Sequence, residues 1–163
     1  LPQLEQQSLY DQYRFDEPWN SPHNSALAKQ MPSVFRCPSD KQAGAMETSY
    51  AAIVGVRTAW PGAKSTTFRD ATDGTSASLL VVEAAGSGIH WMEPRDLHVL
   101  QMAPGIAPPA GQGISSEHPA DGKRHGAMVL FADAHTQYLA PDTPPDLLSS
   151  WIGIDDGTLA APP

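Results

Sequence analysis

Prolines and glycines recur throughout this chain, and they limit the length of every helix and strand that it can form. The 163 residues include 16 prolines and 13 glycines. A proline ends or kinks a helix and removes a ladder hydrogen bond from a sheet, and a glycine inside either element weakens it. We therefore predict a loop-rich fold of short elements in which helix does not dominate. The length suits one domain, and we expect residues 1–163 to form a single domain.

The charge of the chain argues against nucleic acid as a partner. The formal net charge is -8 and the isoelectric point is near 5.0. The ten lysines and arginines do not gather into the basic stripe that polyphosphate binding requires. The single cysteine excludes an internal disulfide. No apolar run approaches the roughly 18 to 20 residues of a membrane span.

Three short apolar runs predict strands. They cover residues 49–56, 78–84 and 127–134, and each is rich in β-branched residues. At this length such runs favour buried strands over helices. Residues 135–139 are expected to pair back on the third run as a hairpin.

Two helices are predicted in the N-terminal part. Residues 1–14 carry good helix formers and no glycine, and we interpret them as the last turns of an amphipathic helix whose apolar side chains are Leu1, Leu4, Tyr10 and Tyr13. A second, short helix is expected to be capped by Asn24 or Ser25 and to stop before Pro32.

The C-terminal part predicts a long loop and a further helix. Residues 103–113 are rich in proline and glycine, and we expect this loop to be the most mobile segment. Near the end, Thr143 is a candidate N-cap, prolines suit the first turn and Asp146 suits the helix dipole. An apolar face of this helix would be formed by Leu147, Leu148 and Trp151.

Cys37 invites a catalytic hypothesis, but the sequence offers it no partner. There is no second cysteine, and no histidine or acid lies at a spacing typical of a catalytic pair. We interpret Cys37 as a small buried residue beside a Pro-Ser-Asp turn.

A metal site is a second hypothesis. His125, Asp133 and His135 bracket the predicted hairpin, and Glu117 and His118 lie just upstream. These residues could bind a transition metal, and the acidic surface could bind calcium through oxygen ligands. No metal-binding pattern fixes their geometry, so we predict no metal ligands.

Signals for nucleophilic catalysis are weak. The chain contains no Gly-x-Ser-x-Gly elbow, and Asp-Gly-Thr at 73–75 and 156–158 is first a turn sequence. The Gly86–Gly88 run lacks the lysine of a phosphate-binding loop. Glu83 ends an apolar strand, where a carboxylate needs solvent or a partner. A hydrogen bond at the strand end is the simpler interpretation.

Five segments, taken in order, resemble a known family. LPQLEQQSLYDQY resembles the end of a long N-terminal helix, FRCPSD a Cys-Pro-Ser-Asp motif, SYAAIVG a Ser-Tyr-x-x-x-x-Gly strand, DATDGTSASLLVVE an Asp-Gly-Thr-Ser segment that ends in glutamate, and HGAMVLFADAHTQYL a C-terminal hairpin. Together they resemble the planctomycete-type pilin-like (pseudopilin-like) proteins of unassigned function, which carry a prepilin-type leader and a processing-associated motif of His, nine residues and Asp-Gly. The residues that carry the resemblance are Cys37, Pro38, Ser39, Asp40, Ser49, Tyr50, Asp73, Gly74, Thr75, Ser76, Glu83, His125 and Asp133.

The C-terminal motif departs from the family pattern in two ways. Seven residues separate His125 from Asp133, and Ala134 stands where the pattern has glycine. A two-residue hairpin of the preferred type needs positive φ, at which alanine costs about 1 kcal/mol more than glycine. We therefore predict a turn of another type.

The resemblance implies a pilin-like α+β fold. The N-terminal helix, of which residues 1–14 would be the end, would pack on a mostly antiparallel sheet with long loops and a short C-terminal helix. Its hydrophobic upstream half, absent from this sequence, would anchor the precursor in the inner membrane before prepilin-type cleavage and would be the chain's only membrane contact. On this interpretation FRCPSD is structural and Cys37 is not a reaction centre.

The resemblance further implies a non-enzymatic role in the cell envelope, periplasmic or extracellular, of the kind found in type II secretion. The expected partners are other pilin-like subunits, or extracellular or periplasmic proteins. No cofactor is expected, apart from a calcium ion of the kind that stabilises a loop in some major pseudopilins.

Two other functions stay open from the sequence. One is a secreted module that binds a small solute or a glycan in a pocket lined by Trp60 and Trp91. The other is a hydrolase that uses Glu83, His125 and Asp133, which requires these three side chains to converge.

Overall fold

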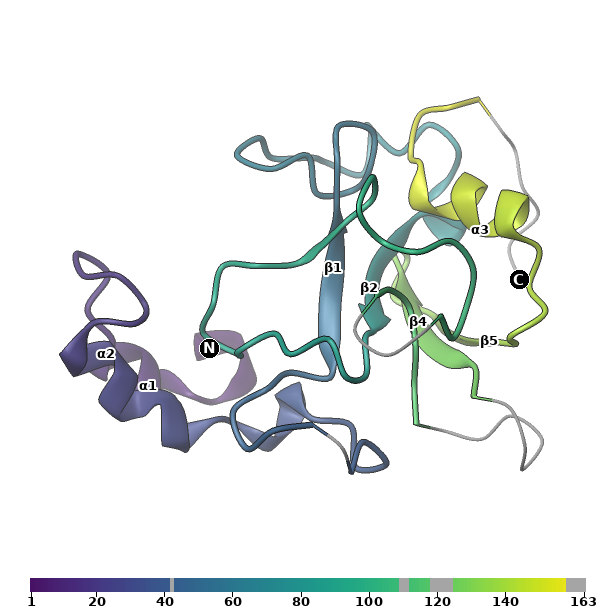
Figure 1. The fold of residues 1–163 in the computed structure, drawn as a ribbon. Helices are drawn as coiled ribbons and strands as arrows, with labels where there is room; N and C mark the ends of the chain where they lie inside the picture. The colour runs from purple at the N-terminus through teal and green to yellow at the C-terminus, as the bar shows by residue number, and fades with distance from the viewer. Residues whose placement is uncertain (42, 109–111, 118–124, 158–163) are drawn as a thin grey trace.

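A five-stranded sheet forms the body of the molecule (Figure 1). The computed structural model describes residues 1–41, 43–108, 112–117 and 125–157. The strand order is β3-β1-β2-β4-β5; β1 and β3 are parallel and the other neighbours are antiparallel. The strands are β1 (Tyr50–Val54), β2 (Leu79–Glu83), β3 (Leu97–His98), β4 (Ala127–Phe131) and β5 (Thr136–Leu139). The α+β class, the mostly antiparallel sheet and the predicted strand runs are confirmed.

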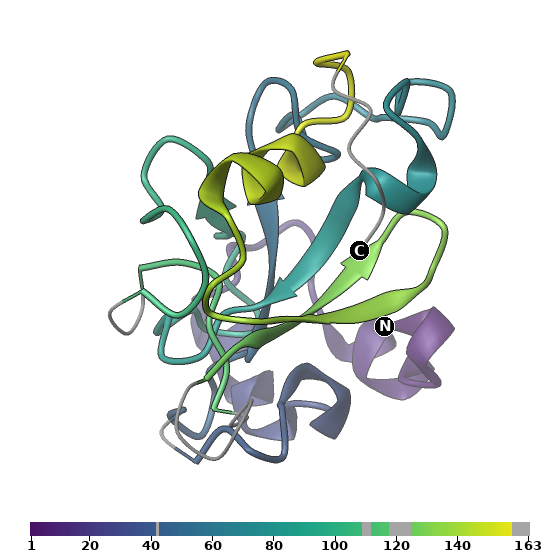
Figure 2. The ribbon, with the colours of Figure 1, turned by 90° about the vertical axis from the view of Figure 1, so that its right-hand side faces the viewer.

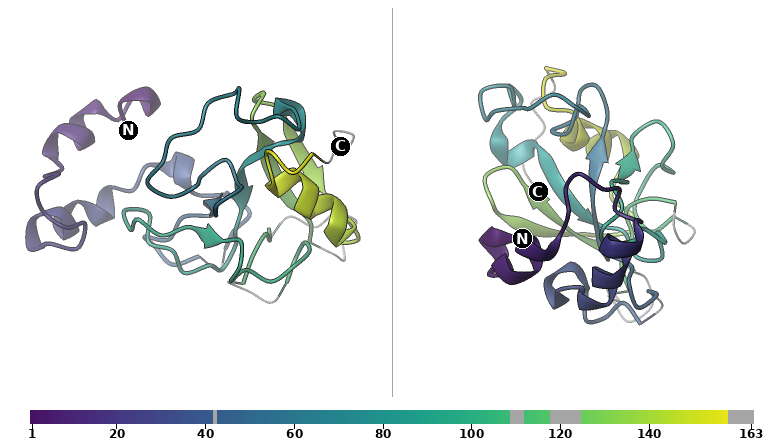
Figure 3. Two further views of the ribbon diagram at one scale, coloured as in Figure 1. Left: turned by 90° about the horizontal axis from the view of Figure 1, so that it is seen from above. Right: turned by 90° about the vertical axis from the view of Figure 1, so that its left-hand side faces the viewer.

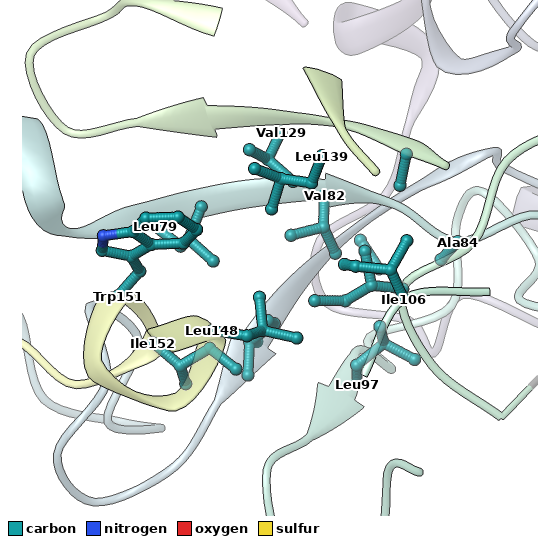
Figure 4. Close-up of a cluster of buried hydrophobic side chains, with 14 of the residues drawn as sticks. Leu79, Val82, Ala84, Leu97, Ile106, Val129, Leu139, Leu148, Trp151 and Ile152 are labelled. Carbon is teal, nitrogen blue, oxygen red and sulfur yellow. The ribbon is translucent and has the colours of Figure 1, made fainter. Parts of the chain in front are cut away.

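One face of this sheet is covered by the C-terminal helix α3 (Pro145–Ile152). Side chains alternate along β4, so that Ala127, Val129 and Phe131 point to the buried side. Figure 4 shows Leu148 and Trp151 of α3 facing this core. The rings of Phe131 and Trp151 meet edge to face at 6.0 Å. Each fully buried large side chain here contributes about 1.5–3 kcal/mol to the hydrophobic stabilisation.

Helix α3 begins where the prolines predict, but its cap differs from the prediction. The N-cap residue is Pro144, Pro145 takes the first helical position and Asp146 lies in the first turn. The Thr143 hydroxyl instead donates to the carbonyl oxygen of Ala140 at 2.7 Å. Because Pro144 stands between Thr143 and the helix, the threonine ends the preceding turn and leaves the helix without a side-chain cap.

The N-terminal helix is shorter than predicted. Residues 1–14 contain a 3₁₀ turn, η1 (Pro2–Leu4), and a separate helix, α1 (Gln7–Gln12). Glu5 between them adopts the left-handed conformation with φ 57°, which ends the first turn. The prediction of one continuous helix over residues 1–14 is therefore wrong.

Helix α1 also lies away from the sheet, in contrast to the packing that the resemblance implies. With α2 (Pro22–Leu27) and η2 (Ala28–Gln30) it forms a separate layer, residues 1–31, here called the arm (Figures 1 and 3). Leu9 is the one buried residue of α1, which is too small an apolar face to hold a helix on a sheet. Figure 2 shows the helix that does cover the sheet, α3, next to β2, and the ring of Trp151 in this helix contacts Phe131 of β4.

The described part of the loop at 103–113 turns back onto the core. Ile106 is 7% exposed and belongs to the main cluster of buried side chains. The Ala103 amide donates to Gln112 and the Ala107 amide donates to Ile114. Residues 109–111 lie outside the described residues. The expectation of a loop is confirmed, and its predicted mobility stays a prediction.

Candidate functional site

The Cys-Pro-Ser-Asp turn meets the start of β1 and the end of β2, and this meeting point is here called the joint. It consists of the side chains of Cys37, Asp40, Ser49, Tyr50 and Glu83, five of the residues that carry the family resemblance. The strand register pairs Tyr50 directly with Glu83. The amide of Ser49 donates to the carbonyl of Phe35, just before the turn, and the Ser49 carbonyl accepts from Ala84, just after β2.

The Asp40 carboxylate holds the turn closed. The Asp40 amide donates to the Cys37 carbonyl at 3.0 Å, which defines the turn. One oxygen of the Asp40 side chain accepts from the Ser49 hydroxyl at 2.9 Å, and the other accepts from the amide of Ala43 at 3.1 Å. Asp40 is 4% exposed and Ser49 is 1% exposed. A buried carboxylate satisfied in this way fixes the backbone and is closed to substrate.

The deeper half of the joint contains an acid, a thiol and a phenol. Glu83 is 2% exposed and accepts from the amide of Met128 in β4 at 2.7 Å. Burial raises the pKa of the Cys37 thiol, and the neighbouring Glu83 carboxylate raises it further. Burial also raises the pKa of Tyr50 to about 12, with Cys37 and Glu83 as additional causes.

These pKa shifts bear on the chemistry of Cys37. A nucleophilic or metal-binding cysteine needs a lowered pKa and access to solvent. Cys37 has a raised pKa and is 3% exposed. The joint therefore suits a structural role, in agreement with the interpretation of Cys37 as a small buried residue.

A second group of motif residues, around Asp73, is hydrogen-bonded to residues 156–157 at the end of the described chain. Gly74 has φ 102° and leads into the 3₁₀ turn η4 (Thr75–Ala77). The Asp73 carboxylate, 5% exposed, accepts from the amides of Asp156 at 2.8 Å and Gly157 at 3.0 Å. The first Asp-Gly-Thr segment thus binds the backbone of the second.

The hairpin between β4 and β5 brings Asp133 and His135 together. The loop has three residues, 132–134: the Phe131 amide donates to the carbonyl of His135, just after the loop, and the Phe131 carbonyl accepts from the amide of Ala134, its last residue. The prediction of a turn other than the two-residue type is therefore confirmed, although Ala134 still adopts a positive φ of 71°. A three-residue loop requires one left-handed position whatever residue fills it.

Asp133 organises this hairpin loop. Its Oδ1 accepts from the His135 amide at 3.1 Å and lies 2.5 Å from His135 Nδ1. This hydrogen bond lowers the pKa of Asp133. The His135 ring stacks on Phe131 with centroids 4.5 Å apart.

The three residues of the hydrolase hypothesis do not converge. Glu83 binds the amide of Met128, near the start of β4, whereas Asp133 lies beyond the other end of this strand. Since a strand advances about 3.3 Å per residue, roughly 15 Å separates Met128 from Asp133. His125 is exposed upstream of Met128. A catalytic set of Glu83, His125 and Asp133 is therefore excluded by the geometry.

The residues of the two other hypotheses, the metal site and the pocket lined by two tryptophans, are not brought together either. No group of three or more metal-binding side chains is found among the described residues, and His118 lies outside them. Trp60 lines a cleft of about 380 Å³, whereas Trp91 lines a separate groove of about 290 Å³. The predicted single pocket lined by both tryptophans is not formed.

Asn24 has a role that the sequence reasoning missed. Its side chain is fully buried; Oδ1 accepts from the Arg14 amide at 3.0 Å, and Nδ2 donates to the carbonyls of Arg14 at 2.9 Å and Pro18 at 3.0 Å. The cap of α2 is Ser21, whose hydroxyl accepts from the Asn24 amide, so the prediction that Asn24 or Ser25 caps this helix is wrong. Ser21 followed by Pro22 is a signal that could have identified this helix start.

The arm is attached to the body through Trp91. The Trp91 indole donates to the carbonyl of Ala28 at 2.9 Å, and its ring stacks on Phe35. Between arm and body runs the 290 Å³ groove, whose wall includes Leu9, Tyr10 and Phe15. In the described part of the chain, no helix has the length and apolar character that a membrane span requires.

Comparison with known proteins gives one match. Residues 1–63 match the family model SBP_bac_10, described as "Protein of unknown function (DUF1559)". The matched part contains the arm, the Cys-Pro-Ser-Asp turn and β1, and it ends before β2 and the hairpin. No curated protein and no solved structure matches the chain. The N-terminal part of the chain is thus similar to a family described as being of unknown function.

Proposed function

We propose that this chain is the non-enzymatic head of a pilin-like subunit of the cell envelope. It acts by self-assembly, or by binding an extracellular or periplasmic partner, and the arm supplies the contact. The observation that carries this proposal is the apolar surface of the arm.

Several large apolar side chains of the arm are exposed to solvent. Phe15 is 68% exposed, Leu4 41% and Tyr10 37%. The ring of Phe15 lies 4.9 Å from those of Tyr10 and Tyr13, so the three form one aromatic cluster. Clustered exposed apolar side chains beside a groove are typical of protein interaction sites.

The joint supports the same proposal, because its polar side chains are hydrogen-bonded within the fold and suit a structural role better than a catalytic one. Asp40 and Ser49 are engaged with each other, and Glu83 is hydrogen-bonded to the sheet. The joint lies on the path from the arm to β1, so it sets the direction in which the arm leaves the body. A fixed arm direction is what a subunit needs in order to present the same surface in every copy.

The proposal extends to location and partners. The head would lie outside the inner membrane, and its partners would be other copies or envelope proteins. Calcium bound at a loop is compatible with the acidic net charge of -8, and it is no part of the proposed mechanism.

Cysteine cross-linking in intact cells tests this proposal. Cys37, the chain's one cysteine, is 3% exposed, so Asp16→Cys in the full-length protein adds an accessible thiol beside Phe15 and leaves the aromatic cluster intact. A maleimide–diazirine reagent attached to Asp16→Cys should, on irradiation, link the protein to a second copy or to an envelope protein, in the envelope fraction. Val56→Cys is the matched control, because Val56 is 91% exposed and lies outside the arm.

The outcomes separate the proposal from its rivals. Linked species from Asp16→Cys, with none from Val56→Cys, would support contact through the arm, and mass spectrometry would distinguish self-assembly from a different partner. Unlinked Asp16→Cys protein, or recovery of the protein in the cytoplasmic fraction, would refute it.

A further inference from the structure

Besides the groove between arm and body, the molecule has a cleft at the end of the sheet opposite the joint. The loop after β1 folds over the bulged part of β2 and encloses a cleft of about 380 Å³. This volume lies within the range of about 300–1,000 Å³ that is typical of small-molecule sites. Its lining includes Trp60, Lys64, Thr66, Thr67, Phe68 and Leu80.

A β-bulge fixes the position of Trp60. The register of β2 against β4 shifts between Leu79 and Val81, so Leu80 falls out of the regular pairing. The carbonyl of Leu80 accepts a hydrogen bond from the Trp60 indole nitrogen at 2.7 Å. The polar edge of the indole is therefore anchored to the sheet, while the side chain stays 43% exposed in the cleft.

The rest of the loop is held by its own hydrogen bonds. The Thr66 hydroxyl donates to the carbonyl of Ala59 at 2.6 Å. The amide and hydroxyl of Thr67 both donate to Asp70, at 2.7 and 2.8 Å. A loop ordered before a ligand arrives loses little conformational entropy on binding.

The cleft exposes two aromatic side chains beside polar ones. Phe68 is 72% exposed, and Trp60 and Phe68 line the same cleft. Full burial of such a ring contributes about 1.5–3 kcal/mol of hydrophobic stabilisation, and an exposed ring does not make this contribution. Lys64 stands at the same cleft, and none of the ion pairs found among the described residues involves it.

From this arrangement we propose that the cleft binds a short saccharide. A pyranose has apolar C–H faces that suit the exposed rings of Trp60 and Phe68, and its hydroxyl groups suit the polar side chains of the loop. Lys64 would contact a hydroxyl group of a neutral sugar or the carboxylate of an acidic one. This activity is independent of assembly through the arm.

The position of the cleft argues against a peptide that adds to the sheet as a strand. Both β1 and β2 are internal strands, and the free edges belong to β3 and β5. Among the described residues, backbone groups beside Trp60 are already engaged, because Trp60 forms a parallel bridge with Val54 and the Leu80 carbonyl accepts from the Trp60 indole, which disfavours backbone pairing with a peptide.

Titration followed by two-dimensional ¹H–¹⁵N spectra tests the inference. The probes are cellotetraose, chitotetraose and tetragalacturonate, each at millimolar concentration, with a proline-rich peptide as a comparison. We expect at least one saccharide to shift the indole N–H signal of Trp60. We expect Phe68→Ala to weaken that binding by about tenfold, and Lys64→Gln to weaken tetragalacturonate selectively.

Control variants keep this test decisive. Phe68 is 72% exposed, so Phe68→Ala is expected to fold even if Trp60→Ala does not. Phe15→Ala removes a phenylalanine of similar exposure from the arm and should leave saccharide binding unchanged. The inference is overturned if no saccharide shifts the Trp60 signal, if only the peptide does, or if Phe15→Ala weakens binding as much as Phe68→Ala.

Discussion

Gly126 has no room for a side chain. A Cβ atom there would lie 2.2 Å from the carbonyl oxygen of Leu139 and 2.5 Å from the hydroxyl of Tyr138, which also accepts from the Gly126 amide at 2.7 Å. Backbone of a paired strand cannot move aside cheaply, so Gly126→Ala should lower the free energy of unfolding by about 2–3 kcal/mol. Urea denaturation measures this change. Gly44→Ala is the control, since a Cβ there meets only the movable side chain of Glu47. Equal losses in both variants would contradict the explanation.

Ala134 carries a backbone conformation that favours glycine. Its φ of 71° costs alanine about 1–2 kcal/mol, which exceeds the extra entropy that glycine loses on folding. Ala134→Gly should therefore raise the free energy of unfolding by about 0.5–1 kcal/mol. Thermal unfolding would show a higher Tm for this variant. A lower Tm would mean that the loop has another conformation in solution.

The phenol and thiol of the joint predict a loss of stability at high pH. Burial raises the pKa of Tyr50 from 10.0 to about 12 and raises that of Cys37 above 9.0. Groups with raised pKa values stabilise the fold fully below their unfolded-state values, and this contribution disappears as pH rises through the folded-state values. Stability should therefore fall from about pH 9 upwards and continue to fall towards pH 12.

Denaturation measured across this pH range checks the prediction. Cys37→Ala should flatten the first part of the fall, and Tyr50→Phe should flatten the part between pH 10 and 12. Tyr10→Phe, which changes an exposed tyrosine of the arm, should lose stability as the unmodified protein does. A Tyr50→Phe curve parallel to that of the unmodified protein would show that Tyr50 titrates normally.

At the scale of elements, the contact between η4 and the C-terminal segment predicts a local effect. The buried Asp73 carboxylate is the acceptor for two backbone amides of residues 156–157. Asp73→Ala should destabilise the fold by about 2–3 kcal/mol, because hydrogen bonds to a charged acceptor are lost and two donors lose their partner. Hydrogen exchange should accelerate first at Asp156 and Gly157.

Asp70→Ala provides the control for this prediction. Asp70 is an exposed carboxylate that also accepts two hydrogen bonds from one turn, those of Thr67. Its loss should leave exchange at Asp156 and Gly157 unchanged. Similar exchange in both variants would mean that Asp73 does not fasten the C-terminal segment.

The sequence predicts the elements that depend on local pattern. The β-branched runs become β1, β2 and β4, and the prolines locate the start of α3. Strand β3 was not predicted, because two residues that pair with β1 leave no periodic signal. The predicted helix over residues 1–14 is interrupted by the left-handed conformation of Glu5, which no periodic signal predicts, and α1 buries Leu9, a residue that the predicted apolar face did not include.

In the candidate site, too, local features could be predicted from the sequence and contacts between distant strands could not. Burial of Cys37 beside a turn follows from the local sequence. Its contact with Glu83, 46 positions later, depends on the pairing of Tyr50 with Glu83, and a register between distant strands cannot be derived from either strand alone. The cleft of Trp60 likewise depends on a bulge in β2, which single-sequence patterns do not reveal.

At the scale of the whole molecule, the structure separates a body built on the sheet from a projecting arm. The body contains the sheet, α3 and most of the buried apolar side chains, whereas the arm depends on Leu9, Asn24 and Leu27 for its own small core. The joint and the Trp91 contacts connect the two parts. Because the aromatic cluster lies on the arm, a contact there leaves the body and its cleft accessible.

The mass of the complex formed by the full-length protein tests the central claim most directly. The protein would be extracted from its own envelope in mild detergent, and native mass would be measured for the unmodified protein, Phe15→Ser and Val56→Ser. We predict a complex of more than one chain for the unmodified protein and for Val56→Ser, and a single chain for Phe15→Ser. An unmodified protein that is a single free chain, or a Phe15→Ser complex of undiminished mass, would contradict the claim that the arm supplies the functional contact.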